Sequence, residues 1–174
     1  MASITPELRD AITGILEKNR LMTLATVRPD GWPQATTVSF VHDGLELYCF
    51  VSRMGQKFLN MKRDARVSAA IGGEFSDPSK IKGLSLAARA SVVEDRAEYD
   101  KMSTVFVTRF PEYAAWPRPN PAFAPLMRLT PEVISVLDYS KGFGHSDMVN
   151  VSRKDIPARV ESRRQSWLAN ILGN

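Results

Sequence analysis

Ser52, Arg53 and Lys57 are the residues whose types and spacing best suit the binding of a small anion. A guanidinium fork and an ammonium group both make charge-assisted hydrogen bonds to phosphate, and the free amides at the start of a helix attract negative charge. The residues after Val51 predict a short helix with Ser52 as its N-cap, which would bring a hydroxyl and both cations to one corner. On spacing alone, a helix cap followed by solvent-exposed basic residues is the simpler interpretation.

The net charge of +4 is concentrated in two segments. Residues 52–66 contain five basic residues and one acidic residue, and residues 151–174 contain five basic and two acidic residues. A short segment of high positive charge suits a compact phosphate better than a long polyanion, which favours a wide basic face. The strands also lack the alternating aromatic and basic side chains on which nucleic-acid bases stack, so we expect no nucleic-acid partner.

The composition of the 174-residue chain excludes several classes of protein. The length and a hydrophobic content of 44% predict a single domain, 1–174, with an ordinary core. No apolar run is long enough to span a membrane and no secretory signal is recognised, so we expect a cytoplasmic protein with no membrane partner. Cys49 is the single cysteine, which rules out an internal disulfide and a thiolate metal cluster. With two histidines the chain offers no catalytic triad, and we assign no catalytic residue and no metal site.

The elements that must hold these residues are mainly strands. Helical spacing of apolar residues after Thr5 predicts a helix at 6–18. From Leu21 the period changes to two, and Asp30-Gly31 and Asp43-Gly44 predict tight hairpin turns between the first three strands. The six alternating segments are 21–27, 34–41, 45–51, 66–72, 83–95 and 126–138.

This pattern predicts a mainly β fold: a six-stranded antiparallel split β-barrel of Greek-key type at about 21–138, with flanking helices and a C-terminal loop and helix at 139–174. Asp95 with Glu98 is typical of a capping box, and the helix that follows should stop near Pro111. Five prolines between 111 and 125 predict an ordered loop, and Pro131 requires a bulge or an edge strand.

The order of motifs from Leu21 to Asp95 resembles a known family. The strands of this stretch are followed by Ser52-Arg53, a helix that carries Lys57 and a strand that begins DARV at 64–67. This order is similar to that of the pyridoxamine 5′-phosphate oxidase-like family of FMN-binding split barrels. The resemblance persists loosely through residues 126–145.

The resemblance implies an FMN site and a homodimer with the cofactor at its interface. Ser52, Arg53 and Lys57 would hold the phosphate, and Gln56 belongs to the same set. The residues that would lie along the flavin ring are Thr36, Thr37, Val38, Ser39, Phe50 and Val51.

Two classes of function follow from this resemblance. The first is an FMN-dependent oxidoreductase acting on an unidentified small-molecule substrate, in which the flavin transfers hydride and electrons while the protein orients it. The alternatives are a non-catalytic sensor or carrier of flavin or haem, and a reductase that uses the deazaflavin F420. Met54 and the ending SWLANILGN depart from the oxidases of vitamin B6, which carry a second basic residue and a Trp-Arg-rich ending at these places.

Five further residues have two interpretations each. Phe143 and His145 belong to a glycine-flanked segment that is either a mobile cover over the ring or a flexible turn. Trp116 and Phe123 either line a substrate pocket or anchor the proline-rich loop. Arg89, in an otherwise apolar strand, either approaches the flavin or pairs with a carboxylate.

Overall fold

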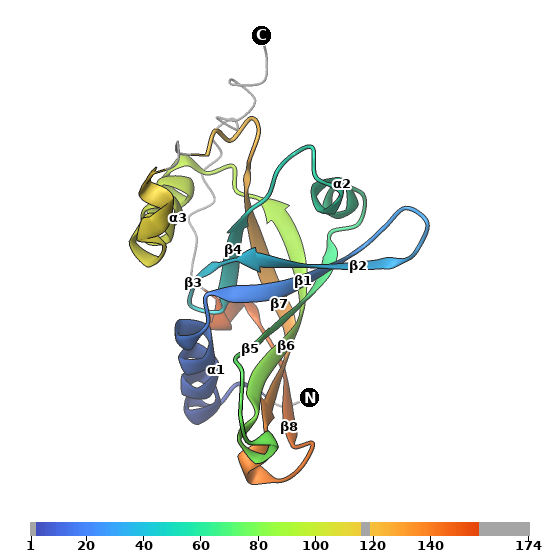
Figure 1. Cartoon of the computed structure of the whole chain (residues 1–174), viewed down its shortest axis with the longest axis vertical. Helices are drawn as coiled ribbons and strands as arrows, with labels where there is room; N and C mark the ends of the chain where they lie inside the picture. The colour runs from blue at the N-terminus through green and yellow to red at the C-terminus, as the bar shows by residue number, and fades with distance from the viewer. Residues whose placement is uncertain (1–2, 116–118, 157–174) are drawn as a thin grey trace.

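The computed structural model describes residues 3–115 and 119–156 (Figure 1). The predicted C-terminal helix beyond residue 156 and Trp116 therefore lie outside the described residues. The helices are α1 (Pro6–Lys18), α2 (Gln56–Arg63) and α3 (Arg96–Arg109), with short 3-10 turns at Pro78–Lys80, Pro111–Ala115, Tyr139–Lys141 and Arg153–Asp155. The strands are β1 (Leu21–Val27), β2 (Pro33–Ser39), β3 (Val41–Asp43), β4 (Glu46–Phe50), β5 (Arg66–Gly72), β6 (Lys82–Val92), β7 (Leu126–Asp138) and β8 (Ser146–Asn150). Over these residues, no helix combines the length and apolar character that crossing a membrane requires.

The strands form one antiparallel sheet that curls back on itself. Its order is β2-β1-β5-β6-β7-β4-β3, and β8 pairs with β7 beyond the end of β4. The two strands at the ends of this order, β2 and β3, are consecutive in the chain and are separated by Phe40 alone. Because the chain itself links the two edges, the sheet closes into a split barrel, and the predicted fold class with flanking helices is confirmed (Figure 1).

The described residues contain eight strands rather than the six predicted. Segment 34–41 was expected to be one strand, but β2 ends at Ser39 and β3 begins at Val41. Phe40 and Val41 are both fully buried, although successive side chains of a flat strand face opposite sides. Phe40 packs in the main core and Val41 in a second core beside α3, so the chain turns a corner between them.

The second additional strand, β8, lies in a segment that was predicted as loop. It pairs with residues 133–137 of β7, and the connecting turn uses Gly142 and Gly144 at positive φ. Only Val149 of its five residues is buried. An edge strand with one apolar anchor carries almost no alternating signal, which explains why the sequence pattern missed it.

Several local predictions are confirmed. The two hairpins β1–β2 and β3–β4 are present, with Gly31 and Gly44 at positive φ in their turns. The Asp95 carboxylate accepts a hydrogen bond from the Glu98 N–H, and α3 ends at Arg109, before Pro111. Pro131 lies where the β6–β7 ladder shifts register, as a proline within a sheet requires.

Two hydrophobic cores hold these elements together. The main core fills the barrel, and α1 contributes Ile12 and Leu16 to it, both fully buried. The second core joins β3 and β4 to α3 through Tyr48 and Phe106. α2 packs against β1, on the part of the β1–β2 hairpin that is next to its turn (Figure 1). The end of β4 and the start of α2 are thereby held on the barrel, and this is where the predicted anion site lies.

Candidate cofactor-binding site

Residues 51–57 form a corner between the end of β4 and the first turn of α2, called here the 51–57 corner. The Gly55 N–H donates to the Ser52 carbonyl at 3.0 Å, and the Met54 N–H donates to Ser52 Oγ at 3.3 Å. The predicted N-cap is wrong, because Gly55 caps α2 and Ser52 lies in the turn before it. A Cβ on Gly55 would lie 3.2 Å from the Ser52 carbonyl oxygen, so a side chain there would require the turn to shift by a few tenths of an ångström. No side chain of residues 3–115 or 119–156 caps α2, and its first amides keep their capacity to bind an anion.

Arg53 is the most constrained side chain of the 51–57 corner. Its backbone N–H donates to the Phe123 carbonyl at 2.8 Å, and its Nε donates to the Pro121 carbonyl at 3.3 Å. Its guanidinium carbon lies 5.2 Å from the centre of the Phe58 ring, within the range of a cation–π contact. No carboxylate of the described residues pairs with it. The guanidinium is thus held in place through Nε, and its two terminal nitrogens form no hydrogen bond with the described part of the chain.

Lys57 is half-buried on the first turn of α2. Within residues 3–115 and 119–156 it too lacks an ion pair with a carboxylate. Burial raises the pKa of the Cys49 thiol to about 12, and the positive charge of Lys57 acts in the opposite direction on that pKa. The Lys57 charge is therefore felt at the end of β4, inside the barrel.

The proline-rich loop forms a wall beside this corner. The Val51 N–H donates to the Pro125 carbonyl at 3.2 Å, next to the Arg53 to Phe123 bond. The Tyr99 hydroxyl donates to the Pro119 carbonyl at 3.0 Å and ties the loop to α3. Phe123 anchors the loop through its carbonyl, while its side chain is 70% exposed. The described part of the loop is ordered by these bonds, as its composition predicted.

The ring-side candidates of β2 face two directions. Thr36 and Val38 lie half-buried on the inner face of the barrel, and Thr37 points outward and is exposed. Ser39 Oγ lies 3.0 Å from the Tyr113 hydroxyl, which links β2 to the 3-10 turn after α3. Thr36 Oγ1 is buried, and none of the described residues offers it a hydrogen-bond partner. An unpaired buried hydroxyl costs about 1–3 kcal/mol, so it marks a place where a ligand atom would be stabilising.

Phe50 and Val51 stand at the end of β4, but their side chains serve the cores. The Phe50 ring packs edge-on against Phe106, with centroids 5.1 Å apart, and against Tyr99 at 6.2 Å. Val51 is 3% exposed and belongs to the main core. The Val51 side chain is thus closed to a ligand, whereas Phe50 is half-buried and keeps part of its surface at this strand end.

Asn60 connects the two groups of candidates, and the sequence analysis missed it. Its amide is fully buried and bonds to Thr26 of β1, Gln34 of β2 and Gln56 of α2. Gln56 is one of the predicted site residues, and its Nε2 is engaged by this bond. A polar residue between the buried Phe58 and Met61 of a short helix is the signal that could have revealed it.

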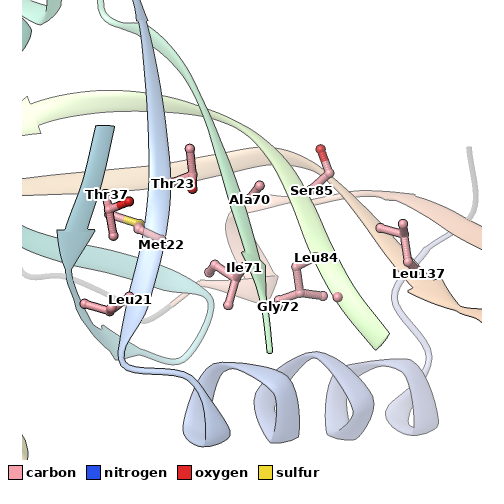
Figure 2. Close-up of a pocket in the computed structure, with 11 residues that line it drawn as sticks. Leu21, Met22, Thr23, Thr37, Ala70, Ile71, Gly72, Leu84, Ser85 and Leu137 are labelled. Carbon is pink, nitrogen blue, oxygen red and sulfur yellow. The ribbon is translucent and has the colours of Figure 1, made fainter. Parts of the chain in front are cut away.

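A separate hollow of about 490 Å³ lies on the outer face of the sheet (Figure 2). Thr23, Ala70 and Ser85 project to the same side of β1, β5 and β6 there, and no charged side chain lines the hollow. Thr37 is its one member from the predicted site, and residues 50–57 do not line it. The hollow and the 51–57 corner are therefore two separate surfaces.

The remaining candidates lie elsewhere in the fold. Phe143 is 94% exposed in the β7–β8 turn, with its ring 5.5 Å from that of Tyr139, and His145 Nε2 lies 3.1 Å from Asp147 Oδ2. Segment 139–145 is thus a hairpin turn. Arg89 pairs with Glu132 at 2.6 Å, which agrees with the carboxylate alternative.

Several proteins of known structure are similar to this chain. A search among curated proteins found no match. A haem-binding protein from Mycobacterium smegmatis has a similar structure, with a TM-score of 0.72 and 21% identity over 84% of this chain; this chain spans only 59% of that protein. HutZ, the haem storage protein from Vibrio cholerae, has a TM-score of 0.61 and 23% identity, covering 75% of this chain and 92% of its own. A FAD-binding protein from Mesorhizobium loti has a TM-score of 0.60 and 20% identity, covering 78% and 95%.

At these identities the solved structures establish the split-barrel fold alone. The family assignment comes from the sequence. The profile of the pyridoxamine 5′-phosphate oxidase family matches residues 8–138, well over half of the chain. The resemblance found from the motifs at 21–95 is therefore confirmed, and the chain belongs to the pyridoxamine 5′-phosphate oxidase family.

Proposed function

We propose that this protein binds FMN, with the phosphate at the 51–57 corner and the flavin ring along β2. The observation that carries the proposal is the pair Arg53 and Lys57, two cations at one corner without a carboxylate partner among the described residues. They stand beside a helix start that no side chain caps. Unpaired cations and free amides at one point are what a phosphate dianion requires.

The strand β2 also offers what the ring of a flavin nucleotide requires. The ring needs a flat surface with polar atoms, and β2 is an edge strand whose outer backbone groups have no neighbouring strand. Thr36 supplies a buried hydroxyl that lacks a partner among the described residues. A ring lying along 36–39 would bring its own polar atoms to this strand edge.

When bound, FMN would supply hydride and electron transfer, so the protein needs no nucleophile of its own. Arg53 would hold the phosphate with its terminal nitrogens, since Pro121 and Phe58 fix the guanidinium plane. Lys57 would add a point charge, and Ser52 a hydroxyl from the turn. We propose an oxidoreductase that acts on a small molecule, with no catalytic residue assigned.

We also propose that the protein is a homodimer. The outer face around the hollow carries small and hydroxyl side chains, with Thr23, Ala70 and Ser85 side by side (Figure 2). A patch of small, uncharged side chains suits contact with a second copy. Because Thr37 belongs to both β2 and the hollow, a partner on this face would reach the ring side of the proposed site.

The first test is the double substitution Arg53→Ala and Lys57→Ala, read by quenching of flavin fluorescence on titration with FMN. Each charge-assisted bond is worth about 1.5–3 kcal/mol, so the loss of both should weaken FMN binding by at least about 100-fold. The purified wild-type protein should be yellow or take up added FMN.

The matched control is the double substitution Lys62→Ala and Arg63→Ala at the other end of α2. Both of these residues are exposed, and neither pairs with a carboxylate of the described residues. FMN affinity should be unchanged in the control. Equal losses in both variants, or none in the first, would show that the phosphate has been placed wrongly.

Haem is a second candidate cofactor, because two of the solved structures with this fold are named for haem. His145 is the described histidine that carries a carboxylate partner, which would orient its imidazole. Titration with haemin should then give a sharp Soret band that His145→Ala removes. A competition titration between FMN and F420 distinguishes these two cofactors.

A further inference from the structure

The buried amide of Asn60 is a feature of α2 that the proposed function leaves unexplained. Asn60 is 0% exposed, and its Nδ2 donates to Thr26 Oγ1 at 2.9 Å and to Gln34 Oε1 at 3.1 Å. Its Oδ1 accepts a hydrogen bond from Gln56 Nε2 at 2.8 Å. Both of its Nδ2 hydrogens and its oxygen are therefore satisfied by three elements of the fold, β1, β2 and α2.

A leucine at this position would pack the same space with less constraint. Asparagine has lower helix propensity, and a buried amide is stable only when each of its polar atoms finds a partner. Apolar packing tolerates small rotations and translations of a helix, whereas three directed hydrogen bonds allow only one placement. The network therefore fixes both the rotation of α2 about its own axis and its position along the β1–β2 hairpin.

The partners of Asn60 lie next to the two halves of the proposed site. Gln56 is the first residue of α2 and precedes Lys57 directly. Gln34 lies on the inner face of β2, two residues before Thr36, whose hydroxyl has no partner among the described residues. The network thus spans the distance between the phosphate side and the ring side.

We propose that Asn60 is a positioning residue that sets the span between β2 and the start of α2, and with it the register of the FMN phosphate relative to the flavin ring. The inference rests on the proposed function. Asn60 itself touches no cofactor atom in this proposal and acts through Gln56 and Gln34. Its loss should therefore weaken the phosphate contribution to binding and leave the ring contribution unchanged.

The test is the double substitution Thr26→Val and Asn60→Leu, which replaces the main bonded pair by apolar groups of similar shape. Such a replacement leaves no buried polar side-chain atom at positions 26 and 60. Gln34 is half-buried and Gln56 is exposed, so their released amides can bond to water and folding should change little. Dissociation constants are measured for FMN and for riboflavin, which has the same ring but no phosphate. In metal sites, loss of a residue that orients a ligand through a hydrogen bond lowers the metal affinity by about 10- to 100-fold. Asn60 orients the phosphate-binding residues in a similar way, so we expect the affinity for FMN to fall by at least about tenfold. Riboflavin binding should not change.

Gln34→Met is the second variant, in case the double substitution impairs folding. It cuts the link to β2 at a half-buried position and should lower the ratio of FMN to riboflavin affinity in the same direction. Asp95→Ala is the control for a general loss of stability, because it removes the cap of α3. The ratio should be unchanged in the control.

The outcomes separate this inference from the proposed function. If the wild-type protein binds FMN through Arg53 and Lys57 but the ratio is unchanged in both network variants, the positioning role is wrong and the FMN site stands. A parallel loss of FMN and riboflavin affinity would make Asn60 merely structural, which also overturns the inference. A wild-type protein that binds no FMN would overturn both.

Discussion

Arg109 shows how one half-buried charge can join two helices. Its NH2 group donates to the carbonyls of Leu16, Glu17 and Asn19, at and just beyond the C-terminal end of α1. Burial lowers the pKa of this guanidinium, and the neighbouring Arg20 lowers it further. The last carbonyls of a helix have no partners within the helix, and a cation at this end also complements the helix dipole. Arg109 thus holds α1 to α3 through the backbone of α1.

Cys49 carries a thiol whose reactivity is controlled by burial. Burial raises the pKa of its thiol to about 12, so the folded protein holds it neutral at pH 8. Reaction with a thiol reagent at pH 8 should be at least about 100-fold slower in the native protein than in denaturant, since the thiolate is the reactive form. Because the unfolded thiol ionises near its usual pKa of about 8.5, native stability should fall as the pH rises above that value. Rapid labelling of the native protein would contradict the burial of this residue.

Among the elements, α3 depends most clearly on its cap. The Asp95 carboxylate accepts the Glu98 N–H at 2.8 Å, while the Glu98 side chain binds Arg128 and the Tyr48 hydroxyl. Glu98 therefore joins the start of the helix to β4 and β7. The first turn of α3 is held both by a cap and by an ion pair.

Asp95→Ala should lower the free energy of unfolding by about 1 kcal/mol, because it leaves the amides of the first turn without their acceptor. The measurement is denaturant unfolding followed by circular dichroism. Asp100→Ala is the matched control on the same helix: it removes an exposed ion pair with Arg96, which is worth at most about 0.5 kcal/mol. Equal effects of the two substitutions would show that the cap is not what stabilises α3.

At the scale of the whole molecule, the two faces of the curled sheet differ. The inner face is packed with the main core and with buried side chains of α1 and α2. The outer face of β5 and β6 carries small exposed residues, Ser68, Ala70, Ser85 and Ala87. Between Arg66 and Arg89 at one end of this face and Lys82 at the other, the surface carries no charged or bulky side chain and can approach a second sheet closely. This is the face that we propose for the dimer contact.

Ala70→Arg should therefore shift the protein from dimer to monomer, because it places a charge in the middle of that face. Size-exclusion chromatography with light scattering gives the mass directly. Ala97→Arg makes the same change at an exposed position of α3 and should leave the mass unchanged. A dimer that survives Ala70→Arg would place the contact on another surface.

Much of the fold was predictable because it depends on local chemistry. The glycines of the two hairpins, the Asp95 cap, and the prolines at 111 and 131 act within a few residues of the chain, and each has the predicted effect. β8 and the break at Phe40 were not predictable in this way. An edge strand with one apolar residue and a corner between two cores depend on contacts distant in sequence.

The sequence by itself determined the family, the split-barrel class and the grouping of Ser52, Arg53 and Lys57 in one short segment, since all three follow from residue order and period. Only the tertiary structure decided what surrounds that segment. Pro121 and Phe58 orient Arg53, and Asn60 ties α2 to β2, through contacts between residues up to 68 positions apart. Hydrogen bonds of this range form only once the barrel has closed, and no local pattern encodes them.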